Sequence, residues 1–174
     1  DTRGEPLTGF RIETLADPKL PSKGPGLTKH GNFVLSEFRA FAVDLVDLEK
    51  KRHLPFSFAK ADFSQNKWAV QASIDGKNET QWGVHPRYGE AHETVFEIKE
   101  PVTYPEETLF TISMENQGGA PGHGIGRFRL SASHDKKSIQ ILEPVSSKVA
   151  DILRIPPDER SLTHRRTLAL TFLQ

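Results

Sequence analysis

The chain has 174 residues, of which 36% are hydrophobic and 26% are charged. This is the composition of a globular domain that can bury a core without help from a disulfide or a metal. Lys and Arg together number 23 and so do Asp and Glu, so no net charge favours nucleic acid or an anionic membrane surface as the partner. The absence of cysteine excludes disulfides and thiolate ligands, and no apolar run approaches the roughly 20 residues that span a membrane.

Most of the chain shows the pattern of β-strands. Phe10 and Ile12 alternate with Arg11 and Glu13 in the segment 10–15, as in a half-buried strand. A long aromatic and β-branched run at 32–43 changes phase around residues 36–39, which predicts a bulge. Further strands are expected at residues 56–63, 93–98, 109–115 and 126–133. Short strands separated by Gly, Pro and Asn turns, without amphipathic helices between them, predict an all-β sandwich or barrel.

The remaining segments are expected to be loops and a helical tail. Residues 17–31 and 118–126 are rich in Gly and Pro, and residues 44–53 predict one helical turn or a charged loop. Helical signals follow at 146–155 and 161–173, with Ser161 as the N-cap of the second helix. We therefore expect a β-sandwich module over residues 1–145 and a helical tail over residues 146–174 that leads toward a further domain.

The segment 74–82 (IDGKNETQW) has the spacing of a cation-binding loop. Asp75 is followed by a glycine that allows a sharp turn, and Thr80 lies five residues after the carboxylate. Ca²⁺ takes carboxylate, hydroxyl and carbonyl oxygens of the kind that such a turn offers. Spacing alone favours an ordinary surface turn, because Asp-Gly is a very common turn dipeptide.

The pattern D-G-x-x-x-T-x-W, formed by Asp75, Gly76, Thr80 and Trp82, resembles the signature of discoidin-type domains and of related galactose-binding-like carbohydrate-binding modules. The resemblance implies a jelly-roll β-sandwich in which this loop holds a structural Ca²⁺. It also implies that the tryptophan packs in the core beneath the loop.

A glutamate on a neighbouring strand completes the calcium site in that family. The stretch FVLSEFRAFA at residues 33–42 resembles this strand and has Glu37 in the matching place. The strand precedes the loop here, whereas the family usually has it after the loop, so the resemblance implies a circular permutation. The metal ligands that it implies are Glu37, Asp75, Thr80 and a backbone carbonyl near Lys77.

A second resemblance covers nearly the whole chain. The stretches LPSKGPGLTKHGNFVLSEFRAFA, ASIDGKNETQWGVHPRYGEAHETVFEI and GRFRLSAS resemble the middle region of the large planctomycete-type cytochrome c proteins, and so does the tail at 151–173. In those proteins the region lies between two domains of unknown function. The resemblance implies a piece of a larger extracellular or periplasmic protein with flanking domains. The chain itself has no C-x-x-C-H haem motif.

The segment 82–92 (WGVHPRYGEAH) combines aromatic, imidazole and guanidinium side chains in a Gly/Pro-containing loop. Sugars need flat apolar faces for stacking and planar donors for their hydroxyl pairs, and Arg87 could bind a sulfated or carboxylated sugar in bidentate fashion. The loop 118–126 adds a further histidine, and the loop 24–31, with Lys29 and His30, could lie on the same rim, although the sequence alone does not place it. The candidate ligand-binding residues are His85, Arg87, Tyr88, His92 and His123. The alternative is a solvated loop that binds nothing.

Catalytic explanations fit less well. His85 and His92 are seven residues apart, which matches no common zinc-site spacing. Arg87, His85 and Tyr88 could serve as neutraliser, base and acid of a polysaccharide lyase, but three residues from one loop can hardly surround a substrate. The segment GHGIGR opens no expected helix and so is no dinucleotide fingerprint.

The sequence therefore predicts a non-catalytic carbohydrate-binding module with a structural Ca²⁺. The predicted partner is a polysaccharide, and anionic or sulfated polysaccharides are included. Neither nucleic-acid binding nor membrane insertion is expected. A spacer domain without a ligand and a lyase-like enzyme remain the alternatives.

Overall fold

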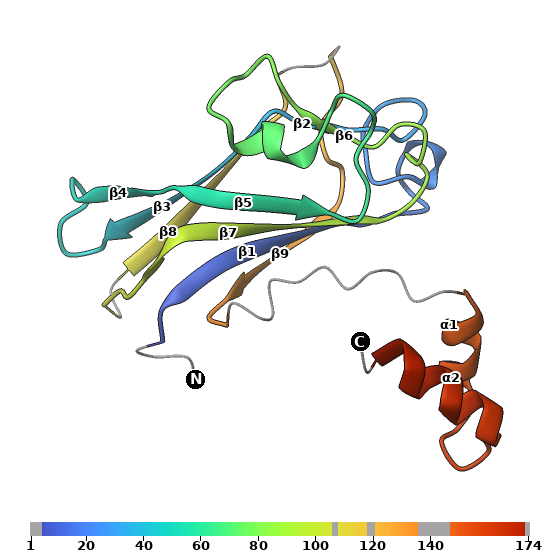
Figure 1. The fold of residues 1–174 in the computed structure, drawn as a ribbon. Coiled ribbons are helices and arrows are strands. Elements are labelled where there is room, and N and C mark those ends of the chain that lie inside the picture. Colours follow the sequence, from blue (N-terminus) through green and yellow to red (C-terminus); the bar gives the residue numbers. More distant parts are fainter. Residues whose placement is uncertain (1–4, 106–107, 118–120, 136–146, 173–174) are drawn as a thin grey trace. The chain divides into compact units, whose positions relative to one another are not determined.

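The computed structural model describes residues 5–105, 108–117, 121–135 and 147–172. The chain divides into two compact units, Asp1–Ile141 and Leu142–Gln174. The first contains all the strands and the second contains the two α-helices (Figure 1). The boundary expected between residues 145 and 146 falls outside the described residues.

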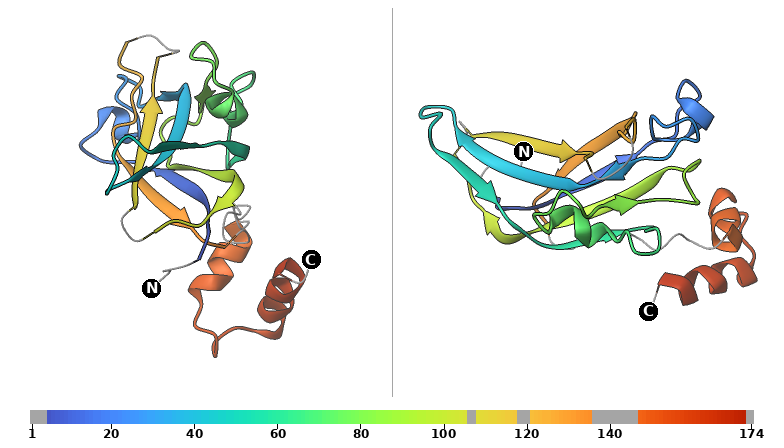
Figure 2. Two further views of the ribbon diagram at one scale, coloured as in Figure 1. Left: turned by 90° about the vertical axis from the view of Figure 1, so that its left-hand side faces the viewer. Right: turned by 90° about the horizontal axis from the view of Figure 1, so that it is seen from above.

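The first unit is an all-β sandwich built from three antiparallel sheets (Figure 2). The largest has the strand order β5 (Phe56–Ala61), β7 (His92–Val102), β1 (Leu7–Thr14) and β9 (Phe128–Ser133). The second has the order β4 (Lys51–Leu54), β3 (Glu37–Asp44) and β8 (Thr108–Glu115). A two-stranded sheet pairs β2 (Val34–Leu35) with β6 (Trp82–Gly83).

Aromatic rings join the two larger sheets. Phe38 of β3 stacks on Phe96 of β7 with ring centroids 4.2 Å apart, and Phe10 of β1 meets Phe38 edge-on at 6.1 Å. All three side chains are buried. The alternation seen in the sequence turns these rings inward, and such aromatic pairs stabilise a core beyond the effect of their buried area.

The expected strands are present, with one difference that matters for the site. The run 32–43 is two strands in different sheets, where the sequence predicted one bulged strand. Ser36 separates them, since its N–H donates to the Glu115 carbonyl at 2.7 Å while the Val34 N–H donates to the His123 carbonyl at 2.9 Å. The polar residue Ser36 within this apolar run therefore marks the point where the chain passes from one sheet to another.

Four short elements were not foreseen, and β6 is one of them. Part of the segment 44–53 forms β4, where the sequence predicted a helical turn or a loop. Two 3₁₀-helices, η1 (Pro21–Lys23) and η2 (Val70–Ile74), lie in regions without periodicity. The second ends at Asp75, so it sets the start of the candidate cation loop.

The second unit consists of α1 (Ser147–Arg154) and α2 (Leu162–Phe172). Ser161 caps α2, since its hydroxyl accepts a hydrogen bond from the His164 N–H at 3.2 Å, as the sequence predicted. Val149 and Ile152 of α1 are buried. Among the described residues, neither helix has the length and apolar character needed to cross a membrane.

Candidate functional site

Backbone hydrogen bonds join distant segments at one end of the sandwich. The Leu27 N–H donates to the Gly124 carbonyl at 3.0 Å, and the Gly126 N–H donates to the Pro25 carbonyl at 2.7 Å. These bonds connect the two Gly-rich loops, so neither is an independent flexible end. The rim of the sandwich comprises the segments 18–33, 84–91 and 121–127.

Two glycines allow close backbone approach on the rim, Gly24 between two of its segments and Gly26 within one. A Cβ atom on Gly24 would lie 2.4 Å from the carbonyl oxygen of Tyr88, and one on Gly26 would lie 2.0 Å from that of Asn32. Both distances are far below van der Waals contact with backbone atoms that cannot easily move. Glycine is therefore required at these positions by packing.

Four rings gather on this rim, and we call them the imidazole–tyrosine cluster: His30, His85, Tyr88 and His123. The Tyr88 ring stacks with that of His85 at 5.5 Å and meets that of His30 edge-on at 5.0 Å, and His30 lies 6.3 Å from His123. His30 and His85 are exposed, and Tyr88 and His123 are partly buried. The rings come from three segments, one in each part of the rim.

Arg87 lies beside the cluster with its guanidinium already bonded. Its Nε and Nη2 donate to the same carboxylate oxygen of Glu90 at 3.1 and 2.6 Å. The Cζ atom of the guanidinium lies 5.1 Å from the centroid of the Phe63 ring. The hydrogen bond between the two side chains lowers the pKa of the Glu90 carboxyl and raises the pKa of the Arg87 guanidinium. Bidentate capture of a ligand by this guanidinium would have to compete with Glu90.

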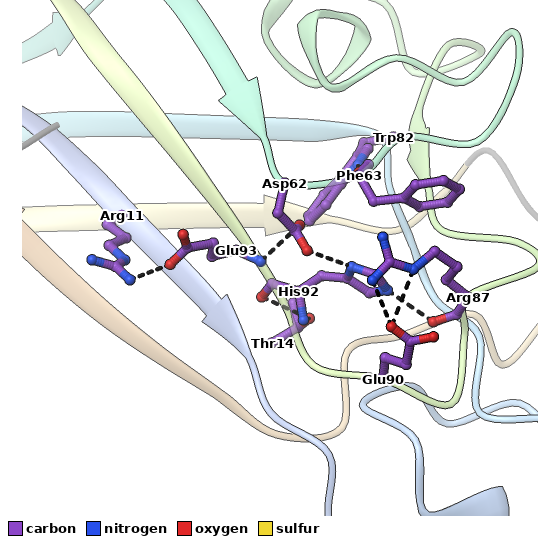
Figure 3. A network of polar contacts seen from close by, with 9 residues as sticks. All are labelled: Arg11, Thr14, Asp62, Phe63, Trp82, Arg87, Glu90, His92 and Glu93. Atoms are coloured by element: carbon purple, nitrogen blue, oxygen red, sulfur yellow. Dashed lines mark hydrogen bonds and ion pairs between the residues drawn. The ribbon is translucent and has the colours of Figure 1, made fainter. Parts of the chain in front are cut away.

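His92 lies next to the loop that carries Arg87 and Glu90 and is bonded to its backbone (Figure 3). Its ring is fully buried, with Nδ1 2.9 Å from the Asp62 carboxylate and Nε2 2.8 Å from the Arg87 carbonyl oxygen. A carbonyl only accepts, so Nε2 carries the proton there. The other oxygen of Asp62 accepts the Glu93 N–H at 3.0 Å.

The two ring nitrogens of His92 therefore join the Asp62 carboxylate on one side to the backbone of the loop on the other. We call Asp62, His92 and the Arg87 carbonyl the histidine clasp. The clasp fixes the position of the loop that presents Tyr88.

The structure thus brings together three of the five predicted ligand-binding residues, namely His85, Tyr88 and His123. Arg87 is adjacent and His92 supports the loop from a buried position. His30 completes the cluster, although the sequence could not place its loop. Its only signal was a Gly/Pro-rich segment with adjacent Lys and His, which is common in surface loops.

The candidate cation loop, Asp75–Thr80, gathers oxygen atoms around one hydroxyl. Thr80 Oγ1 lies 2.9 and 2.8 Å from the two carboxylate oxygens of Asp75 and 3.0 Å from the Lys77 carbonyl oxygen. One hydroxyl has one proton to donate, so it cannot satisfy three acceptors at once. A cation bound among these oxygens would satisfy all of them.

Glu37 approaches this loop from β3 and is almost completely buried, with 2% of its surface exposed. Its Oε1 has no hydrogen-bond partner among the described residues. Burial raises the pKa of Glu37, and the charge of Asp75 adds to this, whereas the N–H groups of Gly76 and Lys77 and the charge of Arg39 act in the opposite direction. The structure therefore places all four predicted metal ligands in one neighbourhood.

Trp82 lies in the core as expected. Its side chain is fully buried, and its indole N–H donates to the Phe63 carbonyl at 2.9 Å. The described residues contain no group of three or more His, Cys, Asp or Glu that could hold a metal. The cation loop differs from such groups because it combines two carboxylates with a hydroxyl and a carbonyl.

A separate open hollow of about 290 Å³ lies at the other end of β3. Its lining includes Lys50, Arg52 and Tyr104, and Arg52 forms no ion pair with any residue that the structure describes. It is therefore a cationic surface remote from the rim.

Comparisons with known proteins assign no relatives to this chain: no protein-family model, no curated protein and no solved structure matches it.

Proposed function

We propose that the sandwich is a non-catalytic carbohydrate-binding module of the galactose-binding-like type, which tethers a larger protein to a polysaccharide. The supporting observation is the imidazole–tyrosine cluster, because four flat rings from three segments meet on a rim whose backbone is already fixed. Flat aromatic faces stack on the apolar faces of sugars, and imidazole nitrogens pair with hydroxyl groups. A preformed surface binds a ligand without the cost of ordering its loops.

The same proposal includes a structural Ca²⁺ in the cation loop. The buried, unpartnered Oε1 of Glu37 and the crowded oxygens around Thr80 form a donor set of hard oxygens, which is what Ca²⁺ prefers. Glu37, Asp75, Thr80 and the Lys77 carbonyl would hold the ion. The ion would supply the positive charge that these oxygens lack and would hold the loop against β3.

Affinity electrophoresis of the whole chain in gels containing neutral, uronic or sulfated polysaccharides, with Ca²⁺ or with a chelator, tests the binding function. We expect selective retardation by at least one polysaccharide. Tyr88→Ala should weaken binding about tenfold, the equivalent of about 1.4 kcal/mol, because it removes the ring at the centre of the cluster. Tyr104→Ala, in the remote hollow, is the matched control and should bind normally.

The same gels separate the alternatives. A lyase would produce new ultraviolet absorbance from unsaturated product ends, and that result would replace the binding function with an enzymatic one. No retardation by any polysaccharide would favour a spacer domain.

A further inference from the structure

The rim is positively charged within a chain of zero net charge. Its three segments together contain five Lys or Arg residues and a single carboxylate, Glu90. These cationic residues are Lys19, Lys23, Lys29, Arg87 and Arg127.

The pairing of these groups leaves an excess of positive charge. Glu90 is bonded to Arg87, and Arg127 pairs with Asp17, which lies just outside the rim, at 2.7 Å. Lys23 and Lys29 form no ion pair with any described residue. Lys29 directly precedes His30, so one of these ammonium groups is next to the cluster in the chain.

The cluster adds hydrogen-bond donors to this charge. Three of its four rings are imidazoles, whose N–H groups can donate to a carboxylate or sulfate oxygen. The carboxylates of the rim and of its edge, Glu90 and Asp17, are each bonded to an arginine. They therefore do not neutralise Lys23 and Lys29.

We propose that the ligand of this rim is an acidic polysaccharide, with carboxylate or sulfate groups. This inference rests on the proposed binding function. Hydrogen bonds from a charged donor to an anionic group are about twice as strong as neutral ones. A ligand anion at the Arg87 guanidinium would compete with Glu90, whereas Lys23 and Lys29 form no ion pair with a described residue and are the main anion ligands in this proposal.

The test uses polysaccharides that differ only in charge: polygalacturonate against its methyl ester, and dextran sulfate against dextran. Binding of the whole chain is measured at one pH and one ionic strength. We expect binding to the acidic member of at least one pair and not to its neutral counterpart.

Variants locate the effect. The double variant Lys23→Gln, Lys29→Gln keeps polar side chains of similar reach but removes two positive charges of the rim, so it should weaken binding to the acidic polysaccharide about tenfold. Arg52→Ala removes a cation at the remote hollow and should behave as the native protein. If Arg52→Ala weakens binding as much as the lysine variant does, the attraction is non-specific and the inference is overturned.

The outcomes distinguish this inference from the function on which it rests. Equal binding to the neutral and acidic members of each pair would keep the binding module and overturn the acidic ligand. An absence of binding to all four polysaccharides and to the wider panel would overturn both.

Discussion

The imidazole–tyrosine cluster and the cation loop are two candidate sites built in opposite ways. The cation loop draws three of its four oxygen donors from six consecutive residues, and only Glu37 comes from elsewhere. The cluster draws its rings from three segments spread over more than 90 positions of the chain. A site of the first kind leaves a motif in the sequence, and a site of the second kind exists only after folding.

The two sites also differ in what holds them in place. Backbone hydrogen bonds and the histidine clasp fix the cluster without any ligand. The cation loop instead leaves a buried carboxylate oxygen without a hydrogen-bond partner among the described residues, and several acceptors face one hydroxyl. The cluster should therefore be independent of metal ions, whereas the cation loop should depend on one.

The largest predicted effect is a loss of stability when a methyl group is added at a glycine where the backbone of the rim is in close contact. Gly26→Ala places a Cβ against the backbone of Asn32, and we expect a loss of about 4 kcal/mol in the free energy of unfolding. Gly89→Ala is the control, because nothing lies within 4 Å of its Cβ position, and it should change stability by no more than about 0.5 kcal/mol. Urea unfolding measures both. Similar stabilities for the two variants would contradict the fixed rim.

The histidine clasp should give the next largest effect. His92→Ala leaves the Arg87 carbonyl and the Asp62 carboxylate without their buried partner, and we expect a loss of about 3 kcal/mol in the free energy of unfolding. His53→Ala, at an exposed position of β4, should lose far less. Polysaccharide affinity should fall for His92→Ala as well, because the loop that presents Tyr88 loses its support. A stable variant with normal affinity would show that the clasp does not position the loop.

The sequence predicted the class of fold and most of the strands because alternation survives folding unchanged. Phe10 and Ile12 occupy the inward positions that their pattern indicated. It missed the change of sheet at Ser36, since a break between two sheets and a bulge within one strand produce the same shift of phase. It also missed β4, whose Lys-rich sequence resembles a charged loop.

The candidate sites differ in the same way, because local spacing predicts one of them and only folding brings the other together. The residues of the candidate cation loop could be named from the sequence, because their spacing is local and resembles a known pattern, and their binding of a cation stays a prediction. His30 could not be assigned, since its place beside Tyr88 depends on the close approach that Gly24 permits. The sequence grouped His92 with the ligand-binding residues because of its neighbours in the chain, and the strand that it begins turns its ring into the core.

Calcium should separate the two sites most clearly. An excess of Ca²⁺ at about 100 times its dissociation constant would stabilise the protein by about 2.7 kcal/mol, or raise Tm by about 5–10 °C in a chain of this size. Glu37→Gln should abolish this shift and, in chelator, be more stable than the native protein, because it removes a buried charge. Glu79→Gln, at an exposed position of the same loop, is the control. An unchanged Tm on chelation, with no Ca²⁺ recovered in the protein, would contradict the calcium site.

The smallest predicted effect is the pH dependence of the unfolding free energy that comes from the buried Glu37 carboxyl. Burial raises the pKa of Glu37 above its unfolded value, so the proton is held more tightly in the folded protein. Its contribution to stability is fully present below the unfolded pKa and is lost as the pH rises through the folded pKa. Without calcium, the native protein should therefore gain stability relative to Glu37→Gln as the pH falls from 7 toward about 4.5.

Other carboxyls act in the opposite direction and must be subtracted. Hydrogen bonds from Arg129 and Arg87 lower the pKa values of Glu13 and Glu90, so their contributions are lost as the pH falls. They are common to the native protein and the variant, and they cancel in the difference between the two unfolding free energies. With Ca²⁺ in excess the sign should reverse, since protonation of Glu37 competes with the ion. A difference that does not vary with pH in chelator would mean that Glu37 is solvated, and the cation loop would then lose the feature that sets it apart from the rim.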